Sequence, residues 1–152
     1  MSQRLSFSDL AGLYRRLLLD DIVPYWAPHI DWEQGGILNC IRDDGTLMTD
    51  DKYMWSQLRA LWIYSKLYNA VEPRQEWLDI AHNILGFIAA HGRNDAGDWV
   101  YHLTREGAVV EGANSIYTEG FAIYGLGEYY RATGDPMARR IGLETCERVI
   151  QR

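Results

Sequence analysis

Residues 51–68 read DKYMWSQLRALWIYSKLY, and ten of these eighteen residues have large apolar or aromatic side chains: Tyr53, Met54, Trp55, Leu58, Leu61, Trp62, Ile63, Tyr64, Leu67 and Tyr68. At 3.6 residues per turn, its apolar side chains point in every direction instead of forming one stripe. A helix that is apolar on all sides is normally buried by its neighbours. We therefore predict a buried helix over residues 51–68, with half-exposed helices packed around it.

This stretch belongs to a unit that occurs twice. Four residue types recur at an almost constant spacing: Gly35 and Gly97 (97−35=62), Gly45 and Gly107 (107−45=62), Tyr68 and Tyr130 (130−68=62), Pro73 and Pro136 (136−73=63). Each unit reads as a two-stranded hairpin, a very apolar helix, a tight turn and an amphipathic helix. Repeated helix pairs indicate a solenoid or a closed ring.

The remaining elements follow from apolar periodicity, caps and turn residues. The expected elements are a helix from about Phe7 to about Ile22, capped by Ser6 or Ser8 and ended by Pro24 and Pro28; a hairpin within 35–49 around Asp44-Gly45; a helix over about 73–90; a hairpin over 99–110 around Glu106-Gly107; an apolar helix from a cap at Asn114 or Ser115 to about 131; and a fifth helix after the turn at 133–136.

Half-exposed and fully buried helices thus alternate along the chain as outer, inner, outer, inner, outer. Two concentric helix layers produce this alternation, whereas a flat bundle would give every helix one apolar stripe. We predict an all-α fold, an incomplete (α/α)6 toroid of about two and a half helix pairs with short β-hairpins before the inner helices. Six pairs at ~60 residues each would need roughly 370 residues.

Residues 1–152 are therefore interpreted as the N-terminal fragment of a single α/α toroid domain. No helix-stop signal follows Ile150, which makes Arg152 a truncation point on this interpretation. Buried edges would then be exposed, and we expect a lone fragment to aggregate or to pair with itself as a homodimer.

Charge and cysteine content narrow the function classes. The formal net charge is −6 and no Lys/Arg run exceeds pairs such as Arg15-Arg16, so a nucleic-acid partner is not expected. Two cysteines make no disulfide framework, which favours a reducing compartment. No apolar segment is long enough to cross a bilayer and the first residues carry several charges, so we predict a cytoplasmic protein without a membrane partner.

The candidate site lies at the start of the inner helices. Trp55 and Tyr117 are repeat equivalents (117−55=62) and should stand at the same depth around the mouth of the ring. Arg59 follows Trp55 by one turn on the same face, and Lys52 precedes Trp55 by three residues. A planar ring beside a guanidinium can bind a polyol, with the ring on C–H faces and the guanidinium on oxygens. The alternative for Arg59 is a buried ion pair, for instance with Glu119 or Glu111.

Four segments resemble the N-acylglucosamine 2-epimerase family in one register over nearly the whole chain. They are residues 51–59 (DKYMWSQLR) with Trp62, Ser65, Leu67 and Tyr68 after them, residues 32–36 (WEQGG) with Asp44-Gly45, residues 99–107 (WxYxLTREG) and residues 121–135 (FAxYGLxEYYxATGD), where x marks a position outside the likeness. The likeness corresponds to the first two-fifths or so of a family member. It implies the (α/α)6 barrel and either epimerisation at C2 of a sugar or the related aldose–ketose isomerisation.

The resemblance also implies roles for particular residues. In family members histidines move the proton beside the carbonyl through an enediolate-like intermediate, and no metal or redox cofactor is required. Arg59 matches an arginine near the carbonyl end of the sugar, where a cation stabilises developing oxygen charge. Trp55 and Tyr117 match sugar-contact positions. The family often has Gly where this chain has Leu58.

The family's catalytic histidines lie in later helices. None of the four histidines here matches them, and His29, His82, His91 and His102 are interpreted as structural or surface residues. The 152-residue chain alone is therefore expected to be inactive. Two other functions stay open: an α/α-toroid glycoside hydrolase using carboxylates such as Glu111 and Glu119, and a non-catalytic helix-repeat scaffold. No spacing of His, Cys, Asp or Glu typical of a metal site is present.

Overall fold

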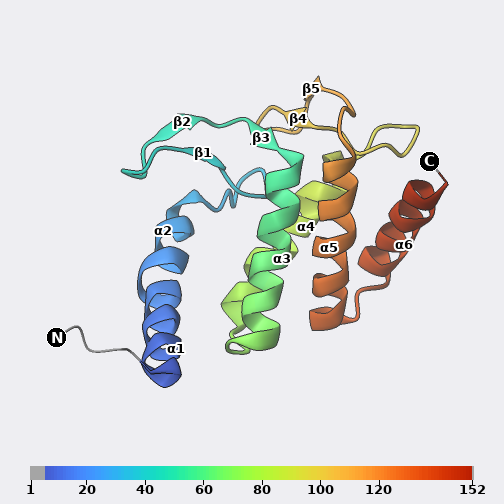
Figure 1. The fold of residues 1–152 in the computed structure, drawn as a ribbon. Helices are drawn as coiled ribbons and strands as arrows, with labels where there is room; N and C mark the ends of the chain where they lie inside the picture. Colours follow the sequence, from blue (N-terminus) through green and yellow to red (C-terminus); the bar gives the residue numbers. More distant parts are fainter. Residues whose placement is uncertain (1–5, 152) are drawn as a thin grey trace. The chain divides into compact units, whose positions relative to one another are not determined.

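The computed structural model describes residues 6–151, in two compact units that divide between Ile30 and Asp31 (Figure 1). The first unit is helical: α1 Phe7–Arg16, the π-helix η1 Leu17–Ile22, α2 Val23–Trp26 and the 3-10 helix η2 Ala27–His29. Ser6 caps α1 by accepting a hydrogen bond from the Asp9 N–H, and the Asp9 carboxylate accepts one from the Ser6 N–H.

The expectation that Pro24 ends the first helix is wrong, because helical turns continue to His29. Pro24 lies in the first turn of α2, where its missing N–H is tolerated. The widened η1 turn leads into it, with the Val23 N–H bonded to the Leu18 carbonyl five residues back.

The second unit contains both predicted hairpins and the four predicted helix regions. Its elements are β1 Cys40–Ile41, β2 Leu47–Thr49, β3 Lys52–Tyr53, α3 Met54–Ala70, α4 Gln75–His91, β4 His102–Leu103, β5 Val109–Glu111, α5 Ile116–Thr133 and α6 Pro136–Ile150. The buried helix predicted from residue 51 begins later, at Met54, because Lys52 and Tyr53 form a strand. That strand pairs antiparallel with β4, which pairs in turn with β5.

The two repeats have the same backbone geometry at equivalent glycines. Gly35 and Gly97 have φ of 83° and 81°, and Gly45 and Gly107 have φ of 83° and 95°. These values lie in the left-handed region, which residues with a Cβ rarely adopt. The repeat found in the sequence is therefore a repeat of turn geometry, and it fixes where each hairpin reverses.

The helices of the second unit pack in the order expected of two layers (Figure 1). The inner helices α3 and α5 lie against each other, α4 packs on α3 and α6 packs on α5. The core between them includes Leu58, Leu61, Trp77, Ile84 and Leu126, all fully buried. At Gly125 the α3 and α5 backbones approach so closely that a Cβ there would lie 2.5 Å from the Leu58 carbonyl oxygen.

A buried ionic cluster holds the start of β3. The Lys52 ammonium donates to Asp31 Oδ2 (2.9 Å) and to the carbonyls of Gly35 (2.6 Å) and Arg105 (2.9 Å). Arg105 donates to the same carboxylate through Nε (2.8 Å) and Nη2 (2.9 Å). The Lys52 ammonium also lies 4.2 Å from the centre of the Phe87 ring. The Lys52 and Asp31 side chains are 0% and 1% exposed.

Burial and hydrogen bonding oppose each other in this cluster. Burial alone would raise the pKa of Asp31, but hydrogen bonds from Arg105 and Lys52 outweigh it and hold that pKa well below its usual range. Burial lowers the pKa of Lys52, and the hydrogen bond to Asp31 opposes this change. The hydrogen bonds to Asp31 and Glu33 raise the pKa of Arg105. The cluster therefore contains one carboxylate shared by two cations.

The close contact at Gly125 leads to a stability prediction. Gly125→Ala should lower the free energy of unfolding by about 1–3 kcal/mol, because the new methyl group forces α3 and α5 apart. Gly127→Ala is the control on the same helix: it meets open space and should raise stability by about 0.5–1 kcal/mol. Urea denaturation measures both, and equal stabilities would show that the α3–α5 seam is not tightly packed.

The ionic cluster leads to a pH prediction. The folded pKa of Asp31 is depressed, so its stabilisation is present above the unfolded pKa of about 3.9 and is lost as pH falls below it. Asp31→Asn should lower the free energy of unfolding at pH 7 by about 3–5 kcal/mol, since it leaves Lys52 buried without its counter-charge. The pH dependence between about 5 and 2 should become shallower.

Glu33→Gln is the matched control, because Glu33 binds the same Arg105 while its side chain is 77% exposed. An exposed ion pair contributes about 0–1 kcal/mol, so this variant should unfold nearly as the wild type does. Denaturant titrations of both variants across the pH range give the comparison. Equal losses at pH 7 would contradict a structural role for the buried pair.

Candidate functional site

The three predicted site residues lie on the two inner helices. Trp55 is the second residue of α3 and Tyr117 is the second residue of α5, as their repeat relationship requires. Arg59 lies one turn further along α3, with its guanidinium carbon 5.5 Å from the centre of the Trp55 ring. Trp55 and Arg59 therefore form a ring and guanidinium pair in direct contact.

Phe121 on α5 connects this pair to the second helix. Its ring centre lies 5.7 Å from the Arg59 guanidinium carbon and 6.3 Å from the centre of the Trp55 ring. Phe121 also follows Tyr117 by one turn, and both side chains line an open hollow on α5. It was not among the predicted site residues, although the repeat contains the signal: Phe121 is the equivalent of Arg59 (121−59=62).

A second pair of repeat equivalents on α3 and α5 is in contact about one turn further along the helices. Trp62 and Tyr124 are repeat equivalents (124−62=62), and their rings stack with centres 4.5 Å apart at 16°. Equivalent positions of α3 and α5 thus meet across the seam between the helices, at Arg59 and Phe121 and again at Trp62 and Tyr124. At these two levels the seam is lined by aromatic rings and by the Arg59 guanidinium.

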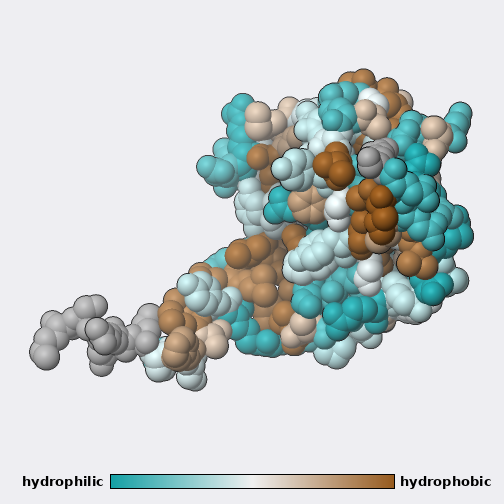
Figure 2. Space-filling view, turned by 45° about the vertical axis from the view of Figure 1, so that its right-hand side comes forward, coloured by the Kyte–Doolittle hydropathy of each residue, from teal (hydrophilic) through white to brown (hydrophobic). Residues whose placement is uncertain are grey.

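An open, shallow hollow lies on the α5 side of this seam. It is lined by Ile116, Tyr117, Gly120, Phe121 and Tyr124. Tyr117 is 77% exposed and Tyr124 is 49% exposed, so the inner helix that looks apolar on all sides is not covered on this face. Figure 2 shows hydrophobic residues reaching the surface in patches between hydrophilic areas.

The sequence left two roles open for Arg59, a cation that binds a ligand and a member of a buried ion pair. Arg59 is exposed, so it is not the buried ion-pair member that the sequence left as an alternative. Its contacts with Trp55 and Phe121 are to ring faces, and a guanidinium beside rings keeps N–H donors for a ligand's oxygens. The residues that line the hollow all belong to α5. Tyr117 is one of them, whereas Trp55 and Arg59 are not, and neither are Glu111 and Glu119, the carboxylates of the hydrolase alternative.

Two other residues differ from what their sequence positions suggested. Lys52 precedes Trp55 by three residues, yet it is turned into the buried cluster with Asp31 and is not available to a ligand. Leu58, which stands where the family often has Gly, is fully buried and does not line the hollow.

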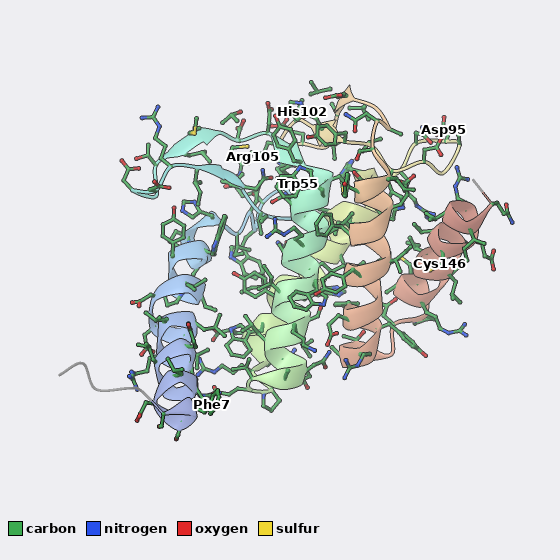
Figure 3. All side chains as sticks on the ribbon, in the orientation of Figure 1. Phe7, Trp55, Asp95, His102, Arg105 and Cys146 are labelled. Atoms are coloured by element: carbon green, nitrogen blue, oxygen red, sulfur yellow. The ribbon has the colours of Figure 1, made fainter. Side chains whose placement is uncertain are left out.

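The histidines lie outside α3 and α5. His82 is on α4, with Nδ1 3.1 Å from the Tyr129 hydroxyl, and His91 ends the same helix. His102 is in β4, with Nε2 3.0 Å from Asp51 Oδ2, and His29 ends η2 in the first unit. Figure 3 shows His102 and Arg105 near Trp55, at the end of α3 where the hairpin joins it.

Residues 6–151 contain neither a candidate metal site nor a helix suited to crossing a membrane. Within these residues no cluster of three or more His, Cys, Asp or Glu side chains is arranged to hold a metal ion. None of the described helices combines the length and apolarity that a membrane crossing requires.

The chain is similar to known sugar epimerases. The bovine N-acylglucosamine 2-epimerase is 32% identical over 137 residues, which cover 87% of this chain and 32% of that protein. The cellobiose 2-epimerase of Bacteroides fragilis is 37% identical over 120 residues, 77% of this chain and 30% of its own length. A crystal structure of a sugar epimerase from a ruminal bacterium superposes with a TM-score of 0.85 at 30% identity, covering 91% of this chain and 36% of that one.

These comparisons agree on the fold and on its extent. The chain spans about a third of the length of the curated relatives it matches. Its described residues have the fold of part of an (α/α)6 barrel, as predicted. The sequence profile described as N-acylglucosamine 2-epimerase (GlcNAc 2-epimerase) matches residues 35–152. This match covers most of the chain, including both hairpins and all four helices of the second unit, and the chain therefore belongs to the N-acylglucosamine 2-epimerase family.

Proposed function

We propose that residues 1–152 are the N-terminal part of one α/α toroid and form one wall of the sugar site of a 2-epimerase or aldose–ketose isomerase. The observation that carries this proposal is the contact of Arg59 with Trp55 and Phe121 on two neighbouring inner helices. An exposed cation beside two aromatic rings suits a ligand with apolar C–H faces and polar oxygens.

The chemistry assigns a different task to each part of the wall. Removing the proton beside a sugar carbonyl moves negative charge onto the carbonyl oxygen. Arg59 stabilises that charge through its N–H donors, and the advantage is larger when water is excluded from the site. Trp55 and Tyr117 cover apolar C–H faces of the sugar, and Phe121 supports the Arg59 guanidinium from the second helix.

The proton-transferring groups are assigned to the rest of the toroid. Family members use histidines of later helices, and no histidine of this chain lies on α3 or α5. The proposal needs no metal or redox cofactor, because the reaction only removes and returns protons and leaves the overall oxidation level of the sugar unchanged. The proposal also includes a cytoplasmic location, a homodimer and no nucleic-acid partner. The free thiols of Cys40 and Cys146 support the cytoplasmic location, and the net charge of −6 argues against a nucleic-acid partner.

Arg59 gives the most direct test. In the complete polypeptide, Arg59→Ala should lower kcat/KM for the sugar by several hundred-fold or so, the effect of losing a charged transition-state contact. Arg139→Ala is the control, because Arg139 is an exposed arginine of α6 and should have no effect. Steady-state kinetics of both variants decide the matter, and a loss of less than threefold at Arg59 would place it outside the site.

Isotope exchange separates the epimerase from the hydrolase. Incubating the complete polypeptide with free sugars in D2O should place deuterium at C2, because the proton beside the carbonyl exchanges with solvent during turnover. Cleavage of a disaccharide without exchange would instead support a glycoside hydrolase. Residues 1–152 alone are expected to give neither product and serve as the negative control. A protein pull-down that survives Trp55→Ala and Arg59→Ala would favour the scaffold function.

A further inference from the structure

The start of α3 is not capped by its own residues. Its N-cap is Tyr53, whose side chain makes no capping hydrogen bond, whereas Ser115 and Asp135 cap α5 and α6 with their side chains. The first N–H groups of a helix need partners from elsewhere. In α3 the N–H of Met54 donates to the carbonyl of Tyr101, which comes from the hairpin of the second repeat (3.0 Å).

His102 makes the side-chain contacts that hold this junction. It lies opposite Tyr53 in the β3–β4 pair, and the two rings stack with centres 4.5 Å apart at an angle of 5°. Its Nε2 lies 3.0 Å from Asp51 Oδ2, on the residue before β3. The His102 side chain is 15% exposed and the Asp51 side chain is 33% exposed, so the ring is largely covered while the carboxylate is partly open to water.

The other groups around His102 complete the junction. The Tyr101 ring meets the Tyr53 ring edge-on at 5.6 Å, and Glu111 is the partner of His102 on the β5 side. Asn39 accepts a hydrogen bond from the Tyr53 N–H (3.1 Å). The ring of Tyr53 is thus held between His102 and Tyr101 while its backbone is held from the first hairpin.

Trp55 lies two residues after Tyr53 and Arg59 one turn beyond Trp55. A helix transmits a displacement of its first residue along its axis, because its hydrogen bonds keep the rise per residue constant. A shift of the order of 1 Å at a site can lower the rate by about a hundredfold. The depth of the Trp55 and Arg59 pair in the wall consequently depends on how residues 51–53 are held.

We propose that His102 is a positioning residue for the sugar wall. Through its hydrogen bond to Asp51 and its stacking on Tyr53, it sets the place of Trp55 and Arg59 relative to Phe121. The kinetic part of this inference rests on the proposed function, whereas the effect on Trp55 does not. His102 is neither acid nor base in this role and touches no reacting atom.

The test uses the complete polypeptide labelled with 5-fluorotryptophan. The 19F resonance of Trp55 is identified by its loss in Trp55→Phe, and three variants are compared with the wild type: His102→Ala, His102→Gln and His82→Ala. The glutamine keeps an N–H donor for Asp51 without the ring. His82→Ala is the control, because it also removes a histidine hydrogen bond, to Tyr129, away from the start of α3.

We expect His102→Ala to shift the Trp55 resonance and to lower kcat/KM by about tenfold or more. His102→Gln should recover most of both effects, and His82→Ala should leave both unchanged. If His102→Ala lowers only the urea midpoint, with the Trp55 resonance unmoved and kcat/KM within threefold of the control, the inference is wrong. It is equally wrong if His102→Gln recovers nothing. A shifted resonance in a protein without epimerase turnover would support the positioning role and reject the proposed function.

Discussion

The buried pair of Asp31 and Lys52 is the contact on which the second unit depends. Removing two charges from water is unfavourable unless every lone pair and proton finds a partner. Here the ammonium has three oxygen acceptors and the carboxylate receives a second cation from Arg105. The groups of this cluster come from residues 31–35, from β3 and from the turn of the second hairpin. The buried charges are therefore satisfied only when these three segments assemble together.

That requirement explains how the two sequence repeats are joined to each other. The second hairpin is held to β3 by the cluster on one face and by His102 and Tyr53 on the other. Because α3 follows β3 directly, the hairpin of the second repeat determines where the inner helix of the first repeat begins. The Gly125 contact with Leu58 then brings α5 close enough for Phe121 to meet Arg59.

The accuracy of the sequence-based predictions follows the range of the interactions involved. The hairpin turns were predictable because a glycine with positive φ sets the geometry of a turn of about four residues. The helices were predictable because apolar periodicity is a local property of the sequence. The start of the buried helix at residue 51 was wrong because a strand formed by Lys52 and Tyr53 needs residues 102 and 103 as partners. The stop at Pro24 was wrong because Pro24 lies in the first turn of α2, after a π-helical turn, where its missing N–H is tolerated.

Local sequence patterns were enough to predict the repeat, the alternation of buried and half-exposed helices, and the equivalent positions of Trp55 and Tyr117 at the starts of α3 and α5. Long-range packing turns Lys52 inward to Asp31, leaves Arg59 exposed beside two rings and brings Phe121 into contact with Arg59. The physical reason is that periodicity reports which face of an element avoids water. The partner that a side chain finds on that face depends on how helices and hairpins more than fifty residues apart are packed together.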